Sequence, residues 1–265
     1  MQITPKRQIK QTFTLLLAGA FFLFSPILPQ NTAAADVKWE KISSYTTYFN
    51  AEDRGRCENI RIAASLVSGV TVQPYGDFSF NQTVGKRTQE AGFQQAKIIV
   101  NGEYVLGTGG GVCQVSTTLY NAALKSGLTV TEFHPHSLQV SYVAPSRDAM
   151  VSSQSDLCFT NPHAFPVRLT VEVFEDGVRA LFWGQKDCYR YEIVSQVLAE
   201  IPPPAPIVKA GEREEILRSP KNGVKSEAYI ERYAGDKLLS RKRLRTDEYR
   251  PVQGIIVKKI GNTPN

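Results

Sequence analysis

The stretch GTGGGVCQVSTTLYNAALKSG, residues 107–127, carries the strongest structural signal in this chain of 265 residues. Its apolar side chains recur at the spacing of one face of an α-helix: Val112, Val115, Leu119, Ala122 and Ala123. They predict a helix over 112–126 that ends at Gly127. The opposite face is expected to carry Cys113, Thr117, Tyr120 and Leu124. Cys113 should therefore lie in the first turn, away from the main core contact.

The segments around this helix predict an α+β fold. Residues 59–68 have the apolar spacing of a shorter helix, with Asn59 as its cap. An Asn-Gly turn between 96–100 and 103–106 predicts a hairpin, and 74–85 is expected to be a loop. Strands are expected at 139–143, 157–160, 167–174 and 178–183. This order predicts helices packed on a mixed or antiparallel sheet.

Composition and charge indicate two globular modules. Apolar residues make up 42% of the chain and charged residues 21%, which excludes wholesale disorder and collagen-like fibres. Residues 36–206 carry 14 Lys or Arg against 17 Asp or Glu, whereas residues 207–265 carry 14 against 8. A stiff proline-rich segment at 202–206 lies near this change of charge. We assign the modules to residues 36–190 and 191–265.

The N-terminal residues 1–35 have the layout of a secretory signal peptide. Three cations, Lys6, Arg7 and Lys10, precede an apolar run at 13–28, and small residues follow at 33–35. The alternative is an uncleaved anchor, although the run is short for a spanning helix. We expect a secreted, extracytoplasmic protein whose contact with a membrane is limited to an uncleaved signal segment.

The glycine-flanked Cys113 is a candidate nucleophile. Free N–H groups at a helix start favour negative charge and lower a thiol pKa. His136 downstream could act as a general base, with Asp148 or Asp156 as the group that orients it. His134 and His136 would share a face on an extended strand. The glycines, Gly109, Gly110 and Gly111, would let a substrate backbone approach closely.

The same residues also allow interpretations without thiol chemistry. Cys113 between valines could be a small buried apolar side chain, and His136 could satisfy a core hydrogen bond. Cys113, His134, His136 and an Asp could ligate zinc, but their spacing is not that of a compact metal motif. The prediction is therefore no metal and no cofactor.

Four cysteines in an exported chain allow three full disulfide pairings. Cys158 and Cys188 flank a strand-rich stretch, so we favour a disulfide between them. This leaves Cys57 and Cys113, and a bond between those two would remove the free nucleophile. A redox-regulated structural protein is thus one possible outcome.

Several motifs of the first module closely resemble the VanW family, over about residues 41–184. These are GDFSFN at 76–81, GTGGGVCQVSTTLYNAAL at 107–124, HS at 136–137, RDAMV at 147–151 and DLCFTN at 156–161. The family takes its name from an accessory protein of B-type vancomycin-resistance clusters. The resemblance implies an exported or membrane-tethered bacterial envelope protein with an α+β VanW module.

By motif position, the signature helix of the family corresponds to the segment of this chain that contains Cys113, Gln114, Ser116, Thr117 and Thr118. In the same way, the HS element of the family corresponds to His136 and its RDA element to Asp148. Two residues depart from the expected pattern. Phe133 replaces a basic residue before the HS element, and Cys57 replaces a polar residue or His before the NI pair at 59–60.

The C-terminal module more loosely resembles the small all-β G-five domain, over about residues 191–262. Strand-like runs at 227–234, 237–245 and 254–260 carry this resemblance, with a hairpin turn at 234–236. It implies attachment to glycan or anionic wall polymer. The candidate binding residues are Arg241, Lys242, Arg243 and Arg245. These cations could instead form a solvated strand end; export argues against nucleic acid, and no base-stacking motif is present.

Together these features predict a cell-wall-associated VanW-family protein that binds or modifies peptidoglycan. In an enzyme, Cys113 would attack a peptide carbonyl, His136 would act as base, and N–H groups of 111–114 would hold the oxyanion. Such an enzyme would be a Cys–His hydrolase or transferase. Expected substrate-binding residues are Gly109, Gly110, Gly111, Gln114 and Thr117. The alternative is a non-catalytic wall-binding or scaffold protein.

Overall fold

A computed structural model describes residues 38–100 and 102–259. The predicted signal peptide, residues 1–35, lies outside the described residues, and so does the alternative anchor. Within the described ranges, no helix combines the length and apolar character that crossing a membrane requires.

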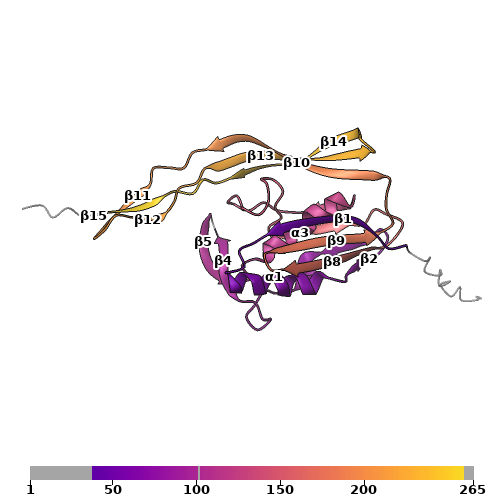
Figure 1. Ribbon diagram of the computed structural model, residues 1–265, viewed down its shortest axis with the longest axis horizontal. Helices are drawn as coiled ribbons and strands as arrows, with labels where there is room; N and C mark the ends of the chain where they lie inside the picture. Colours follow the sequence, from indigo (N-terminus) through magenta and orange to yellow (C-terminus); the bar gives the residue numbers. More distant parts are fainter. Residues whose placement is uncertain (1–37, 101, 260–265) are drawn as a thin grey trace, which may run out of the picture. The chain divides into compact units, whose positions relative to one another are not determined.

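A four-stranded antiparallel sheet forms the centre of the first module (Figure 1). Its order is β1 (Glu40–Tyr48), β9 (Gly177–Gly184), β8 (Val167–Phe174) and β2 (Thr71–Val72). Helix α3 (Val112–Lys125) packs on β1 and β9, and α1 (Arg54–Val67) packs on β8. The two helices contact each other, so they cover the same face of this sheet.

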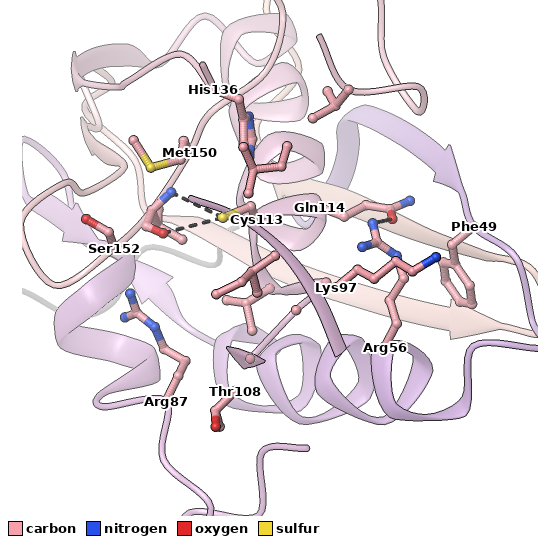
Figure 2. Close-up of a pocket in the computed structure, with 18 of the residues that line it drawn as sticks. Phe49, Arg56, Arg87, Lys97, Thr108, Cys113, Gln114, His136, Met150 and Ser152 are labelled. Carbon is pink, nitrogen blue, oxygen red and sulfur yellow. Dashed lines mark hydrogen bonds between the residues drawn. The ribbon is translucent and has the colours of Figure 1, made fainter. Parts of the chain in front are cut away.

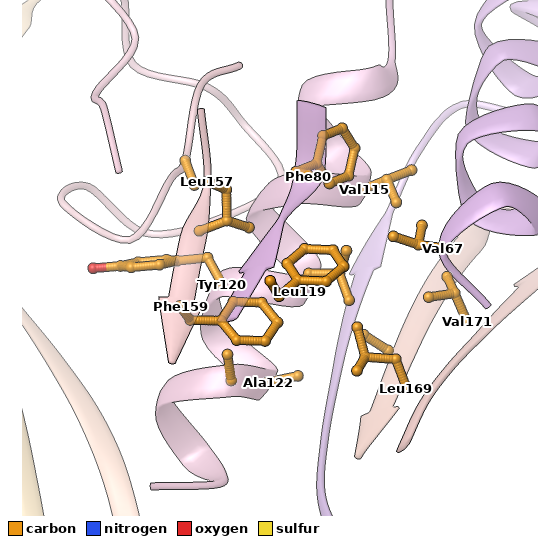
Figure 3. Close-up of a cluster of buried hydrophobic side chains, with 14 of the residues drawn as sticks. Val67, Phe80, Val115, Leu119, Tyr120, Ala122, Leu157, Phe159, Leu169 and Val171 are labelled. Carbon is orange, nitrogen blue, oxygen red and sulfur yellow. The ribbon is translucent and has the colours of Figure 1, made fainter. Parts of the chain in front are cut away.

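Helix α3 lies at the predicted position but is buried on nearly every side. Tyr120 and Leu124, which we placed on the face opposite the main core contact, are 0% and 4% exposed. Strand β6 (Thr129–Glu132) and the segment 147–149 cover that face, and Ser116 Oγ donates to Ala149 O at 2.6 Å. Figure 3 shows Tyr120 and Phe159 among the buried side chains around α3. A second layer of chain therefore encloses the helix.

Helix α1 begins five residues before its predicted start. Its cap is Asp53, whose carboxylate accepts from Arg56 N at 3.2 Å. The predicted cap, Asn59, is buried inside the helix, where its amide donates to Gln94 O and Gly110 O at 3.0 and 2.9 Å. Its carbonyl oxygen accepts from Gln94 N at 2.7 Å. Asn59 thus holds α1 to the chain that leads into α3.

The remaining elements of this module confirm some predictions and correct others. The hairpin is formed by β4 (Gln95–Val100) and β5 (Glu103–Thr108). A second sheet has the order β3 (Asp77–Ser79), β7 (Cys158–Thr160), β6, and the predicted loop contains a short α2 (Phe80–Val84). The strand predicted at 139–143 is wrong, because this segment is irregular; its Val140 and Val143 are buried by packing against the rest of the module.

The C-terminal part is all β. One antiparallel sheet has the order β10 (Tyr189–Ile201), β13 (Gly223–Ala234), β14 (Lys237–Tyr249). The other has the order β11 (Ile207–Gly211), β15 (Ile255–Lys259), β12 (Glu215–Arg218), with β11 and β15 parallel. The predicted α+β fold followed by an all-β module is confirmed. The module boundary after residue 190 stays a prediction, because residues 38–259 pack as one compact unit.

Replacing the buried Asn59 tests its role in the fold. Asn59→Ala leaves Gly110 O and Gln94 N without partners and removes one of the two hydrogen bonds to Gln94 O, so we expect the free energy of unfolding to fall by about 2–3 kcal/mol. Urea unfolding followed by circular dichroism measures this loss. The exposed Gln89→Ala is the control and should change stability by less than about 0.5 kcal/mol. Equal stability of both variants would contradict the assignment.

Candidate functional site

A cleft of about 1090 Å³ opens at the start of helix α3. It lies between α1, the β4–β5 hairpin and the segments 140–142 and 150–153 (Figure 2). The lining includes six of the predicted site residues: Gly109, Gly110, Gly111, Cys113, Gln114 and His136. The structure thus brings the predicted nucleophile and base to one cavity.

The glycines before α3 allow two neighbouring elements to approach closely. A Cβ on Gly110 would lie 2.6 Å from Lys97 O in β4, and one on Gly111 would lie 3.0 Å from Arg56 O in α1. Gly111 also has φ +108°, a value that L side chains rarely adopt. These glycines serve the packing of the protein on itself, and their contact with a substrate stays a prediction.

Cys113 is half-buried and is held by one backbone residue of the facing segment. Its Sγ lies 3.5 Å from Val151 N, which donates to it, and 3.4 Å from Val151 O. His136 lines the same cleft and interacts with the sulfur, because it is among the groups that lower the pKa of the Cys113 thiol. The Val151 backbone therefore fixes the position of the sulfur, and His136 is the imidazole that acts on it.

The His136 ring is oriented by Asp148. Nδ1 lies 2.6 Å from Asp148 Oδ2, and the backbone N–H of His136 donates to the same oxygen at 2.7 Å. Of the two carboxylates that the sequence left open, Asp148 is the one bonded to His136. Asp156 instead accepts from Ser79 Oγ and Asn81 N, so it holds the start of α2. Cys113, His136 and Asp148 therefore form one candidate catalytic group.

Electrostatics favour an ion pair between Cys113 and His136. Burial opposes charge on the imidazole, but the hydrogen bond to Asp148 and the contact with Cys113 raise the pKa of His136 to about 9. Burial also raises the pKa of the Cys113 thiol, but His136, the Val151 contact and Arg87 outweigh it and leave that pKa below its usual value. Both shifts favour the thiolate–imidazolium form of the pair over the neutral form.

Asp148 is supported from the C-terminal module. Tyr249, in β14, donates through its hydroxyl to Asp148 Oδ1 at 2.5 Å, and Arg245 donates through Nη1 to Asp148 O at 2.6 Å. Burial disfavours the Asp148 charge, but His136, Arg245 and Tyr249 together hold the pKa of this carboxyl below its usual value. Sequence reasoning missed Tyr249, because it lies 101 residues from Asp148.

The assignment of Arg245 to wall-polymer binding is wrong. Its side chain is 4% exposed, bonds Asp247 at 2.5 Å and lies over the Phe133 ring at 5.0 Å. Phe133 is one of the two residues that depart from the expected family pattern, and its ring lies under this buried cation. The other three cations, Arg241, Lys242 and Arg243, are exposed.

Two predicted substrate-binding residues have mainly structural contacts. Gln114 lines the cleft, but its amide donates to Thr47 Oγ1 and Tyr48 O at 3.0 and 2.9 Å. Thr117 is buried outside the cleft lining, and its hydroxyl accepts from Ala149 N at 3.0 Å. Thr117 therefore holds the segment that carries Asp148 against α3.

His134 does not share a face with His136. The segment 133–136 is irregular, and His134 Nε2 lies 2.9 Å from Glu132 Oε1 at a half-exposed position that does not line the cleft. Among the residues that the structure describes, no three His, Cys, Asp or Glu side chains are grouped so that they could hold a metal ion.

The predicted Cys158–Cys188 disulfide is not formed. Cys158 Sγ faces two carboxylates, at 3.4 Å from Asp156 Oδ2 and 3.8 Å from Glu132 Oε2, while Cys188 is exposed before β10. Cys57 Sγ lies 3.6 Å from Ala51 O and is not bonded to Cys113. All four cysteines are free thiols.

The ion pair predicts a low thiol pKa. Because His136 stabilises the thiolate, alkylation of Cys113 by iodoacetamide should follow a midpoint well below the ~8.5 of an ordinary thiol. His136→Ala should raise that midpoint, and His134→Ala should leave it unchanged. Mass spectrometry of the Cys113 peptide over pH 5–10 measures this. A midpoint near 8.5 in the unaltered chain would refute the pair.

The buried position of Arg245 predicts a large effect on stability. Arg245→Ala leaves Asp148 and Asp247 with less compensation, so we expect a loss of about 3–5 kcal/mol in the free energy of unfolding. Arg243→Ala, which removes a cation from an exposed ion pair on the same strand, should cost less than about 1 kcal/mol. Thermal unfolding compares the two, and similar losses would contradict the buried role.

Comparison with known proteins gives two curated relatives. The family model described as VanW like protein matches residues 55–183. "Uncharacterized protein YoaR" of Bacillus subtilis is 36% identical over 169 residues, which are 63% of this chain and 54% of that protein. "Vancomycin B-type resistance protein VanW" of Enterococcus faecalis is 28% identical over 78 residues, 29% of this chain and 28% of that protein. The chain thus spans about half or less of these relatives.

A solved structure described as "Crystal structure of HP0197-G5" is 15% identical, and its match covers 26% of this chain and 96% of that chain with a TM-score of 0.16. At that score the match carries no structural argument. The motifs at the cleft, the family match over 55–183 and the two curated relatives agree. Residues 55–183 of this chain match the VanW family, the family that the motifs of the first module resemble.

Proposed function

We propose that this protein acts on peptidoglycan peptides by acyl transfer through Cys113, on the outer side of the cell membrane. The observation that carries this proposal is the grouping of Cys113, His136 and Asp148 at an open cleft, where Asp148 is hydrogen-bonded to His136 and His136 lowers the pKa of Cys113. A thiolate next to an imidazolium is the ground state of a Cys–His nucleophile.

The reaction conserves atoms and charge with groups on this chain. Cys113 Sγ attacks a peptide carbonyl carbon, so a C–S bond forms while the C–N bond breaks. The imidazolium of His136 gives its proton to the leaving amine, and a thioester remains on Cys113. Water or an amine then attacks the thioester, His136 takes its proton, and the thiolate leaves.

Part of the predicted oxyanion site is already occupied. The N–H groups of Val112 and Gln114 donate to Gly109 O and Gly111 O at 3.1 and 2.9 Å. These two groups are therefore not free to bind a developing oxyanion. The negative oxygen would instead depend on the other groups that line the cleft.

Peptidoglycan is the proposed substrate because of family and location. A B-type vancomycin resistance protein is among the relatives, and the N-terminal sequence predicts export. Arg241, Lys242 and Arg243 are exposed on β14, where they could contact an anionic wall polymer. Two of them pair with glutamates: Arg241 with Glu231, and Arg243 with Glu227.

A non-catalytic wall-binding protein is the second candidate. The same exposed cations favour it, because cation-rich surfaces attract anionic polymers without any reaction. In that case the cleft would bind a wall peptide and leave it unchanged.

Incubation with muropeptides released from purified walls tests the proposal. Mass spectrometry should detect altered muropeptides and an acyl adduct on Cys113. Cys113→Ala should abolish both, His136→Ala should slow turnover about 10²–10⁴-fold, and the matched His134→Ala should retain it. Unchanged muropeptides together with wall binding by the Cys113→Ala variant would favour the second candidate.

A further inference from the structure

The cleft around Cys113 gathers cations from three segments. Arg56 comes from α1, Lys86 and Arg87 follow α2, and Lys97 lies on β4. Figure 2 shows Arg87 to one side of Cys113, and Arg56 and Lys97 to the other. The acidic side chain among the lining residues is Asp53, whose Oδ1 accepts from Arg56 N.

None of these four cations pairs with a carboxylate among the residues that the structure describes, taking 4.0 Å as the limit. Other cations of the chain do pair, such as Lys125 with Glu192 at 2.8 Å. Overall composition does not explain this difference, because residues 36–206 carry more acidic than basic side chains. The positive charge is therefore local to the cleft.

The two guanidinium groups are oriented by neutral partners. Arg87 Nη1 donates to Asn81 Oδ1 at 2.7 Å and to Gly85 O at 3.2 Å. Arg56 Nη2 donates to Gln114 Oε1 at 2.7 Å. A guanidinium has five N–H donors, so each retains donors for a ligand. Neutral partners position the cation without cancelling its charge, which suits binding of a planar anion such as carboxylate.

We propose that Arg56, Arg87 and Lys97 form a subsite for a carboxylate of the substrate, beside the carbonyl that Cys113 attacks. The inference rests on the proposed function and narrows its substrate to peptides with a negative charge near the scissile bond. Lys86, which is exposed at the rim, adds to the attraction. An amidated peptide of the same shape would bind less well.

Two small alkylating reagents of nearly equal size test the subsite, because iodoacetate is an anion and iodoacetamide is neutral. Both react with the same Cys113 thiolate, so the ratio of their rates does not depend on the thiol pKa. The exposed Cys188 of the same chain gives the ratio for an ordinary site. We expect the iodoacetate-to-iodoacetamide ratio at Cys113 to exceed that at Cys188 about tenfold at low salt.

Variants that remove a positive charge, and added salt, show whether the preference of Cys113 for iodoacetate comes from the cations of the cleft. Arg87→Gln and Lys97→Gln should each lower the Cys113 ratio several-fold, while Lys41→Gln, an exposed cation of β1 outside the cleft lining, should not change it. Raising the salt concentration on the unaltered chain should lower the ratio as well, which provides a test that needs no folded variant.

The outcomes separate the subsite from the thiol chemistry. Equal ratios at Cys113 and Cys188, with Cys113 reactive, would overturn the subsite and leave the proposed function intact. A Cys113 that reacts with neither reagent would overturn both. A raised ratio that falls with salt and with Arg87→Gln or Lys97→Gln supports the carboxylate subsite.

Discussion

The buried charge of Asp148 is the constraint on which the site depends. A carboxylate that is 1% exposed is costly to bury unless hydrogen bonds and opposite charges compensate it. The compensation comes from His136 on one oxygen and from Tyr249 and Arg245 on the side of β14. Because the last two belong to the C-terminal sheet, the strands after residue 190 contribute directly to the geometry of the candidate triad. The attached module is therefore part of the site as well as a candidate for wall attachment.

Helix α3 carries Cys113 and also holds the segment that contains Asp148. It is a buried helix that carries several buried polar side chains, and those of Gln114, Ser116, Thr117 and Asn121 bond to the chain around it. Thr117 and Ser116 hold Ala149, the residue after Asp148, while Thr118 bonds Thr47 in β1 at 2.7 Å. Polar groups in a core are stabilising only when all are satisfied, and they then specify one arrangement. The distance between Cys113 and the Asp148 segment is set by these bonds.

The cleft combines rigid packing with excess positive charge. Gly110 and Gly111 bring α1 and β4 against the start of α3, which places Arg56 and Lys97 around the sulfur. The cations of the cleft lining serve two roles in the proposed chemistry, because Arg87 favours the thiolate and all of them attract an anionic substrate. The glycine run thus allows the close packing of α1 and β4 against α3, and this packing places the cations in the cleft lining.

The sequence by itself determined the local elements and the candidate site residues. Helical periodicity predicted α3, and the Asn-Gly turn predicted the β4–β5 hairpin. Residue types and family motifs gave Cys113 and His136 as candidates, with Asp148 or Asp156 as the group that orients the imidazole. These signals are local, since a helix stripe or a tight turn depends on neighbours within a few residues. Tertiary structure alone decided that Tyr120 and Leu124 are buried, that Asp148 rather than Asp156 bonds His136, and that Arg245 is a core cation. Those outcomes depend on contacts between residues far apart in the chain, as with Tyr249 and Asp148, and no periodicity or spacing encodes which distant segment covers a given face.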